Sequence, residues 1–234
     1  MSGFGQFCPV SRALEVLGER WTLLIMRDLL HGVMHFNDLA RGLPHLSRGL
    51  LSKRLKTLCD EGIIVREEVD GGVQYSVTQA GEELRPLIYQ LLRWGTRWRF
   101  EEPQEDELDP VLLMWWMRRR VVSERLPKGR QVVQFDFTEE PERSFWLLLE
   151  RSDVSVCLDP PPYDIDIWVD GSLAALFEVW MGKEEFDGTI DDGRIRIRAL
   201  PWQEREFSSW FSRSPGVPLV KEELARLRSQ PDLN

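Results

Sequence analysis

The chain has 234 residues, of which 42% are hydrophobic and 29% charged, and this balance excludes disordered, collagen-like and fibrous proteins. At this length two domains of about 100 residues each, both able to bury a core, are expected. The formal net charge of −9 disfavours nucleic-acid binding by the chain as a whole, so any basic surface within it requires a specific explanation.

Charge divides the chain into two halves. Residues 1–100 contain 13 lysines and arginines against 11 acids, a net charge of +2, whereas residues 101–234 contain 17 against 28, a net charge of −11. The segment 101–110, EEPQEDELDP, has six acids, two prolines and one apolar residue, a composition that resists packing. We therefore expect a domain at 1–100, an acidic linker at 101–110 and a second domain at 111–234.

The sequence shows neither a leader peptide nor a membrane span. The N-terminus MSGFGQFCPV lacks a basic region followed by an apolar run, and stretches such as Trp21–Met26 are too short to cross a bilayer. The three cysteines, Cys8, Cys59 and Cys157, are an odd number without metal-ligand spacing. We expect a cytoplasmic protein with free thiols, no disulfide framework and no metal site.

The N-terminal half begins with helical patterns. Apolar residues between Ala13 and Leu17 predict one short helix, and Trp21–Leu30 predicts a second that ends near Gly32. Residues 37–42 are enough for only a small third helix, and a turn follows at 42–44.

A fourth helix is predicted from the capping residue Ser47 to about Glu61, where Gly62 stops it. Because successive residues on a helix are rotated by about 100°, this helix has an apolar face and an opposite polar face. If the helix is considered alone, the polar face is most simply a solvated surface, as most charged stripes are. The residues are Leu51, Leu55 and Leu58 on the apolar face, and Gly49, Ser52, Lys53 and Lys56 on the polar face.

A β-hairpin is predicted directly after this helix. Ile63–Val65 and Val73–Val77 flank the turn Asp70-Gly71-Gly72, and apolar and polar residues alternate in the second segment. The order of helix, turn, polar-faced helix and hairpin is that of a winged helix-turn-helix, whose second helix enters the DNA major groove. The combination favours DNA binding over a merely solvated helix.

Several longer motifs occur in this half in the order typical of one family. They are CPVSRALEVLGERWTLLIMRDLLHG from Cys8, HFNDLARGLPHLSRGLLSKRLKTLCDEGIIVRE from His35 and YSVTQAGEELRPL from Tyr75, followed by Trp94 and Trp98. Across roughly residues 7–99 the chain therefore resembles the HxlR type of bacterial transcription regulator.

This resemblance implies a dimer that binds double-stranded operator DNA through the fourth helix. One departure concerns the hairpin, or wing, which carries Glu67, Glu68 and Asp70. Like charges repel phosphate, so we expect the wing to contribute little and the helix to supply most of the affinity. The residues expected to face the groove and the phosphates are Ser47, Arg48, Gly49, Ser52, Lys53 and Lys56.

Residues 79–100 predict a helical segment with a broad apolar stripe that needs a partner. The stripe can pack on its own domain, or, as the resemblance implies, pair with the first helix and with its copy in a second subunit. We favour the homodimer, whose two-fold symmetry would present two recognition helices to half-sites about one helical turn apart. The stripe consists of Leu84, Leu87, Ile88, Leu91, Leu92, Gly95 and Trp98.

Cys8 is a candidate redox sensor. It precedes Pro9 at a predicted helix start, where the positive end of the helix favours the thiolate and so lowers the pKa. Some HxlR-type regulators use a cysteine at this position to sense electrophiles or oxidants. The alternative, a small residue that fills a dimer interface, is favoured because the sequence offers no evident resolving partner.

The C-terminal half mixes strand and helix patterns and predicts an α+β fold. A helix is expected at 110–126, and four strand-like runs in succession with short turns predict an antiparallel sheet. A helix capped by Ser172 and ending at Met181, one more strand and a closing helix at Glu204–Phe211 follow. The strand-like runs begin at Val132, Ser144, Val154, Asp164 and Ile195.

The stretch DGSLAALFEVWMGKEEFDGTIDDGRIRIRAL, Asp170–Leu200, is similar to the signature of sterol carrier protein type 2 domains. That resemblance implies an apolar tunnel for lipids. The usual small apolar residue before the Gly-Arg-Ile strand is replaced around Gly188 and Thr189, and the usual glycine after it is Ala199. The resemblance therefore supports the fold more strongly than the ligand.

Aromatic residues favour a ligand pocket over an active site in this half. Seven of the ten tryptophans lie beyond residue 110, and aromatic walls suit an apolar pocket, although each tryptophan alone is more simply part of a core. His31, His35 and His45 all lie in the other half, so no histidine is available beside Cys157 or a serine for nucleophilic catalysis. We expect no enzyme activity and no cofactor. The candidate lining residues are Trp115, Trp116, Trp146, Trp168, Phe177 and Trp180.

Three hypotheses follow. The leading one is a dimeric transcription regulator whose C-terminal domain binds an apolar small-molecule effector. In the second, the C-terminal domain binds or carries a lipid or sterol as its own activity. In the third, Cys8 is the only sensor and the C-terminal domain is structural.

Overall fold

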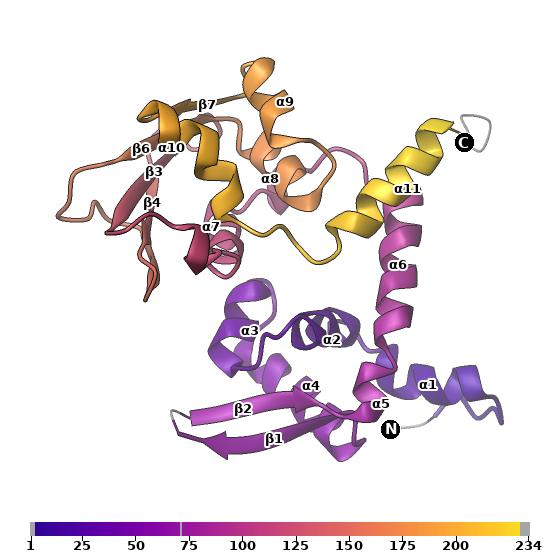
Figure 1. Ribbon diagram of the computed structural model, residues 1–234. Helices are drawn as coiled ribbons and strands as arrows, with labels where there is room; N and C mark the ends of the chain where they lie inside the picture. Colours follow the sequence, from indigo (N-terminus) through magenta and orange to yellow (C-terminus); the bar gives the residue numbers. More distant parts are fainter. Residues whose placement is uncertain (1–2, 71, 230–234) are drawn as a thin grey trace. The chain divides into compact units, whose positions relative to one another are not determined.

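The computed structural model describes residues 3–70 and 72–229 (Figure 1), which form two compact units divided between Leu91 and Leu92. The division falls inside a helix, α6 (Arg85–Trp98), and not in the predicted linker at 101–110. Two buried apolar clusters correspond to the two units, so each unit has its own core.

The N-terminal unit contains the predicted helices and hairpin. β1 and β2 pair antiparallel from Ile64 opposite Val77 to Val69 opposite Gly72, and residue 71 of the predicted turn lies outside the described residues. The core is formed mainly by α2, α3 and α4 with the start of β1. The elements are α1 (Pro9–Leu17), α2 (Thr22–Leu30), α3 (Phe36–Gly42), α4 (Arg48–Asp60), β1 (Ile64–Val69), β2 (Gly72–Val77) and α5 (Gln79–Glu82).

The ends of α4 follow from the two residues that the sequence singles out. The Ser47 hydroxyl oxygen accepts a hydrogen bond from the Leu50 backbone N–H at 3.3 Å and satisfies one free donor of the first turn. Gly62 adopts a φ of 68°, a left-handed conformation that glycine adopts without strain, and the chain turns there into β1. The predicted extent of this helix is confirmed.

The C-terminal unit combines helices with a five-stranded sheet. Its core lies between the sheet and helices that include α7 and α8. No helix among the described residues is long and apolar enough to cross a membrane. Besides the end of α6, the elements are η1 (Glu105–Glu107), α7 (Pro110–Arg118), η2 (Ser123–Arg125), β3 (Gln131–Phe137), β4 (Ser144–Leu149), β5 (Val154–Cys157), β6 (Ile167–Gly171), α8 (Leu173–Met181), α9 (Phe186–Asp191), β7 (Ile195–Arg198), α10 (Pro201–Glu206), η3 (Phe207–Trp210) and α11 (Val217–Ser229).

The sheet is mixed, and the prediction of a purely antiparallel sheet was wrong. Its strand order is β5-β4-β3-β6-β7, in which β6 runs parallel to β3 with Val133 opposite Ile167. The other three pairs are antiparallel. Residues 158–166, which include three consecutive prolines, carry the chain from the edge strand β5 past β4 and β3 before β6 begins. A crossover of this kind, and not a tight turn, produces the parallel pair.

Helix boundaries in this unit also differ from the predicted ones. The helix expected at 110–126 ends at Arg118, and the predicted closing helix is divided into α10 and η3. The helix α11 was not predicted; it packs against α6 through ion pairs of Arg93 with Glu222 (2.8 Å) and of Arg97 with the buried Glu223 (3.9 Å). These contacts explain why the end of α6 belongs to the C-terminal unit.

The prediction that Ser172 caps α8 is confirmed. The Ser172 hydroxyl oxygen accepts a hydrogen bond from the Ala175 N–H at 3.2 Å, and Gly182 ends the helix with a φ of 82°. A second residue, Glu139 in the turn that follows β3, accepts hydrogen bonds from the backbone N–H groups of Leu173 and Ala174. The start of α8 is therefore anchored to the sheet.

Candidate functional site

The polar face of α4 is exposed along its length. All six residues predicted to contact DNA lie in the exposed class, while Leu51, Leu55 and Leu58 on the opposite face are at most 1% exposed. The exposed residues are Ser47, Arg48, Gly49, Ser52, Lys53 and Lys56. We call these six residues the α4 face.

Arg48 is held at the start of this face. Its guanidinium donates a hydrogen bond to the Asn37 side-chain oxygen at 2.6 Å and lies 5.0 Å from the centre of the Phe36 ring. Both partners belong to α3, so the charge is positioned by the preceding helix. An arginine fixed in this way suits a directional contact with phosphate or a base edge.

The two lysines of the α4 face differ in their surroundings. Lys56 forms an ion pair with Asp60 one turn later at 2.6 Å, and this hydrogen bond raises the pKa of Lys56. Lys53 has no ion-pair partner among the described residues. The charge of Lys53 is therefore less compensated by neighbouring acids than the charge of Lys56.

Arg54, the fourth basic residue of this segment, has a structural role. Its side chain is 12% exposed and pairs with Glu19 at 2.5 Å while also donating to the Arg20 carbonyl oxygen. It therefore ties α4 to the turn before α2. The local charge of the α4 face comes from Arg48, Lys53 and Lys56.

The wing carries exposed acids, as the sequence predicts. Glu67 and Glu68 are exposed on β1; Glu68 pairs with Arg66 at 3.3 Å, and Glu67 accepts a hydrogen bond from the Ser76 hydroxyl. With Asp70 the wing has three acids against one arginine. A surface of this charge repels phosphate, in contrast to the α4 face.

Exposed apolar side chains also occur along α6 and on α1. Leu87, Leu91, Trp94 and Trp98 follow one another along α6 at spacings of four, three and four residues, and each is between 42% and 55% exposed. Ile88, from the predicted stripe, is buried in the core of the N-terminal unit. The spacing is that of a helix–helix seam. On α1, Val10 and Leu14 are also exposed.

Cys8 occupies the N-cap position of α1, directly before Pro9. Hydrogen bonds from the backbone N–H groups of Ser11 and Val10 lower the pKa of its thiol. Burial instead raises the pKa of Cys59, on α4. Of these two thiols, Cys8 is the more readily ionised.

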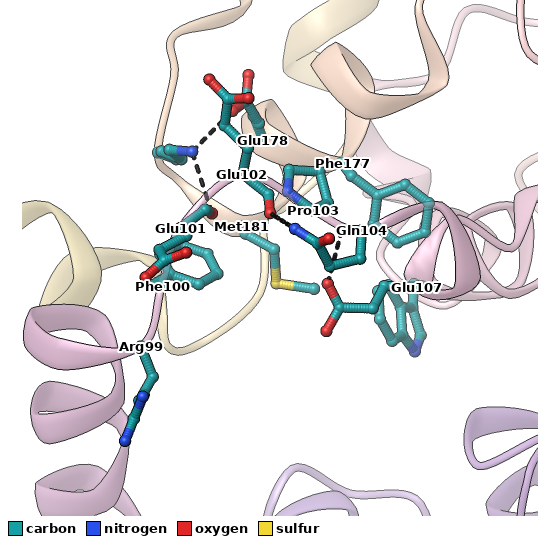
Figure 2. Close-up of a pocket in the computed structure, with 12 residues that line it drawn as sticks. Arg99, Phe100, Glu101, Glu102, Pro103, Gln104, Glu107, Phe177, Glu178 and Met181 are labelled. Carbon is teal, nitrogen blue, oxygen red and sulfur yellow. Dashed lines mark hydrogen bonds and ion pairs between the residues drawn. The ribbon is translucent and has the colours of Figure 1, made fainter.

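A cavity of about 550 Å³ lies in the C-terminal unit, beside α8 (Figure 2). Of the six predicted lining residues, Trp116 and Phe177 line it, with ring centres 5.9 Å apart in an edge-to-face arrangement. Trp115, Trp146 and Trp180 are buried and Trp168 is half-buried on β6, so none of these four lines this cavity.

Five of the twelve residues that line the cavity belong to the predicted linker at 101–110. The lining includes Phe100–Gln104, and the Glu107 carboxylate accepts a hydrogen bond from the Gln104 backbone N–H at 2.9 Å. Lys183 bridges the wall to α8, because its ammonium group donates to the Glu101 carbonyl oxygen at 3.2 Å and pairs with Glu178 at 2.9 Å. The acidic composition predicts an unpacked linker, whereas residues 101–104 form part of the cavity wall beside α8.

Comparisons with known proteins identify relatives of the N-terminal part of the chain. The family model described as HxlR-like helix-turn-helix matches residues 16–103. YvaP of Bacillus subtilis, an HTH-type transcriptional regulator, is 36% identical over 40% of this chain and 90% of its own length. An HTH-type transcriptional regulator of Synechocystis, sll1512, is 32% identical over 44% of this chain and 79% of its own length.

Solved structures match a similar share of this chain. The oxidized form of the redox regulator HypR is 32% identical over 38% of this chain and 94% of its own, with a TM-score of 0.36. The identity to YvaP extends over nearly the whole of that regulator. The chain therefore belongs to the HxlR-like helix-turn-helix family of DNA-binding transcription regulators.

Proposed function

We propose that the protein is a homodimeric transcription regulator that binds operator DNA through the α4 face and responds to an apolar small molecule bound in its C-terminal unit. The regulator has no catalytic activity of its own. The observation that carries the DNA-binding part is the position of three cations and two hydroxyls on one exposed side of α4, opposite three buried leucines.

The proposed DNA contact is confined to α4. The second helix of a helix-turn-helix lies in the major groove with its N-terminal residues at the base edges. Arg48, Gly49 and Ser52 lie in the first turns of α4, so we assign them to the groove, and Lys53 and Lys56 to phosphates. The acidic wing adds repulsion, so affinity depends on this helix more than on the hairpin.

The apolar residues of α6 and α1 support the proposed dimer. Isolated exposed apolar side chains are ordinary, but four in a helical seam with aromatic members are typical of an interface. In a two-fold symmetric dimer the same surface of both subunits forms the interface, so the partner of α6 is its copy in the second subunit. Size-exclusion chromatography with light scattering tests the assembly directly, and Leu91→Glu should produce a monomer.

The DNA-binding proposal is tested by the double substitution Lys53→Ala and Lys56→Ala. Each lysine that neutralises a phosphate releases a counterion, so the slope of log affinity against log salt should fall by about one per lysine. Fluorescence anisotropy with operator DNA between low and moderate salt measures that slope. Lys128→Ala, which removes an exposed lysine of the C-terminal unit, is the matched control. An unchanged slope in the double variant would refute the assignment of α4.

The effector proposal competes with a lipid-carrier activity of the C-terminal unit. The cavity with its aromatic wall supports binding of a small molecule and is compatible with both. A regulator couples occupancy to operator affinity, whereas a carrier does not. Native mass spectrometry of gently purified protein, followed by anisotropy with and without the retained ligand, separates the two. Sterol-carrier-like lipid transport would be supported by transfer between vesicles that leaves operator affinity unchanged.

A second candidate function is redox sensing by Cys8. The lowered pKa of this thiol supports it, since the thiolate is the reactive form. Cys8→Ser should abolish release of operator DNA by diamide or quinones. Cys59→Ser, which removes the thiol whose pKa is raised, should leave the release intact. Oxidant-driven release that persists in Cys8→Ser would eliminate this function.

A further inference from the structure

Three acidic residues of the cavity beside α8, which we call the α8 pocket, lack a cationic partner. Glu101, Glu102 and Glu107 all line it, and none of them forms an ion pair within the described part of the chain. Glu178 differs, because Lys183 and Arg194 both pair with it, at 2.9 and 3.0 Å. The uncompensated charge of the wall is therefore negative.

The basic residues of the lining do not reverse this charge. Lys183 is committed to Glu178 and to the Glu101 carbonyl oxygen. Arg99 is exposed, and Figure 2 shows its side chain extending away from the other labelled residues. The segment 101–234 around the pocket has a net charge of −11 from 17 bases and 28 acids. The field at the pocket therefore attracts cations and repels anions.

The rest of the wall is aromatic and apolar. Trp116 and Phe177 meet edge to face with ring centres 5.9 Å apart, and Phe100 and Met181 also line the cavity. Aromatic faces attract cations as well as apolar groups, and the methionine thioether adapts to irregular ligands. Acidic and aromatic groups thus converge on one cavity.

We propose that the α8 pocket binds an amphipathic organic cation, that is, an aromatic or alkyl body carrying a quaternary or delocalised positive charge. The volume of about 550 Å³ is within the range of drug-sized ligand sites. Fatty acids and other anionic lipids are disfavoured by the same three carboxylates. The proposal narrows the apolar effector of the proposed function to one that also carries a positive charge. Its regulatory consequence rests on that function, but binding itself does not require DNA.

The pocket is placed where a ligand can act on α6. Arg99 and Phe100 follow the last residue of this helix directly, and Phe177, Glu178 and Met181 come from α8. A ligand held between these segments fixes residues 99–104 against α8. The C-terminal end of α6, which carries Trp98 of the exposed seam, is fixed with them.

The test compares two ions of the same shape and opposite charge. Isothermal titration calorimetry of the full-length protein, without DNA, measures binding of tetraphenylphosphonium and of tetraphenylborate. We expect saturable binding of one cation per chain, and affinity for the borate at least roughly tenfold lower, because one sign of charge is attracted and the other repelled. Equal affinity for the two ions would overturn the proposal, and so would undetectable binding of the cation.

Substitutions assign the binding to the pocket. Glu107→Gln removes the charge but keeps an amide oxygen that can accept the Gln104 hydrogen bond, and we expect a roughly fivefold loss of cation affinity for this half-solvated contact. The double variant Glu101→Gln/Glu107→Gln should lose more cation affinity than Glu107→Gln alone. Glu105→Gln, in the same short 3-10 turn but outside the lining, is the matched control and should bind as the parent protein does.

The outcomes separate this inference from the proposed function. If the cation binds with the expected charge dependence but leaves operator affinity unchanged, the pocket stands and the effector role fails. If the protein binds operator DNA but not the cation, the DNA-binding function stands and the pocket assignment fails. Cation binding that is insensitive to Glu101→Gln/Glu107→Gln and to Trp116→Leu would place the ligand elsewhere and overturn the proposal.

Discussion

α4 and α8 begin in the same way and are used differently. Each starts at a serine, Ser47 or Ser172, whose hydroxyl oxygen accepts a hydrogen bond from the backbone N–H three residues later. On α4 only one face is buried, whereas on α8 six of the nine residues are buried. The cap therefore determines where a helix begins, and the distribution of apolar side chains determines which surface remains free to bind.

The difference extends to the kind of site each helix can form. The polar face of α4 is exposed, so a partner larger than the protein unit itself, such as the proposed operator DNA, can reach its charges. α8 contributes Phe177, Glu178 and Met181 to the α8 pocket, and the rest of the wall comes from residues 99–104, Glu107, Trp116 and Lys183. An exposed helix face suits DNA, and a concave pocket suits a small molecule.

The largest effects should come from the buried residues of the two helices. Leu55 on α4 is 1% exposed and Leu176 on α8 is 3% exposed, so substituting either with alanine leaves a cavity that costs about 2–5 kcal/mol of stability. Hydrogen exchange followed by mass spectrometry should show that Leu55→Ala lowers protection in the N-terminal unit and Leu176→Ala in the C-terminal unit.

Because each unit has its own core, each loss should be largely confined to one unit. Leu55→Ala should also weaken operator binding, whereas Leu176→Ala should leave the α4 face intact. A uniform loss of protection across both units after either substitution would contradict the division at Leu91 and Leu92.

The second-largest effect should come from reversing the negative charge of the wing, which contrasts with the positive α4 face. Glu67→Lys with Glu68→Lys replaces repulsion of phosphate by attraction, and we expect operator affinity to rise about tenfold and the salt slope to steepen by about two. Fluorescence anisotropy over a salt series measures both. Glu140→Lys with Glu142→Lys makes the same change of charge in the C-terminal unit and is the control. A wing variant that behaves like this control would show that the wing does not approach DNA.

The predictability of the two units differs for a physical reason. In the N-terminal unit, caps such as Ser47 and Gly62 and the alternation in β2 are local signals, and all of these elements were predicted. The α4 face follows from helical periodicity alone, once the leucines are assigned to the core.

In the C-terminal unit the decisive contacts are distant in sequence. The pairing of β6 with β3 depends on where a crossover leads, and α11 is stabilised by Arg93 and Arg97, more than 100 residues earlier in the chain. Trp116 and Phe177 were predicted to line a pocket, but Glu107 was not, because its segment is too acidic to suggest packing, and Phe100 was assigned to the preceding helical segment. Composition shows that this segment is polar, but it does not show which side chains elsewhere in the chain pack against it.

A smaller effect is expected at the start of α8, where Glu139 supplies a cap that α4 lacks. Burial raises the pKa of Glu139, but hydrogen bonds from Leu173, Thr138, Ser172 and Ala174 outweigh it and leave the pKa lowered. Glu139→Ala should destabilise the C-terminal unit by roughly 1 kcal/mol at neutral pH.

The pH dependence of this effect has a definite sign. Since the folded pKa lies below the unfolded one, the stabilisation is present above the unfolded pKa and is lost as the pH falls through the folded pKa. Urea unfolding of parent and Glu139→Ala proteins should therefore differ at pH 7 and converge below about pH 4. Glu140→Ala, which removes a neighbouring carboxylate that does not cap α8, should show no such convergence.

The smallest effect is expected from adding a methyl group at Gly49 on α4, compared with the same change at Gly188 on α9. Gly49 lies in the first turn of α4, and an added Cβ there meets no atom within 4 Å, so Gly49→Ala should stabilise the helix by about 0.5 kcal/mol through its higher helix propensity. Gly188→Ala in α9 is the matched control, since that position is equally open and exposed. Both variants should gain stability, but only Gly49→Ala should lose operator affinity, because its methyl group occupies the space into which a major-groove edge must fit. If Gly49→Ala binds operator DNA as tightly as Gly188→Ala does, the first turn of α4 does not closely approach the bases, and the phosphate contacts of Lys53 and Lys56 would have to supply most of the affinity.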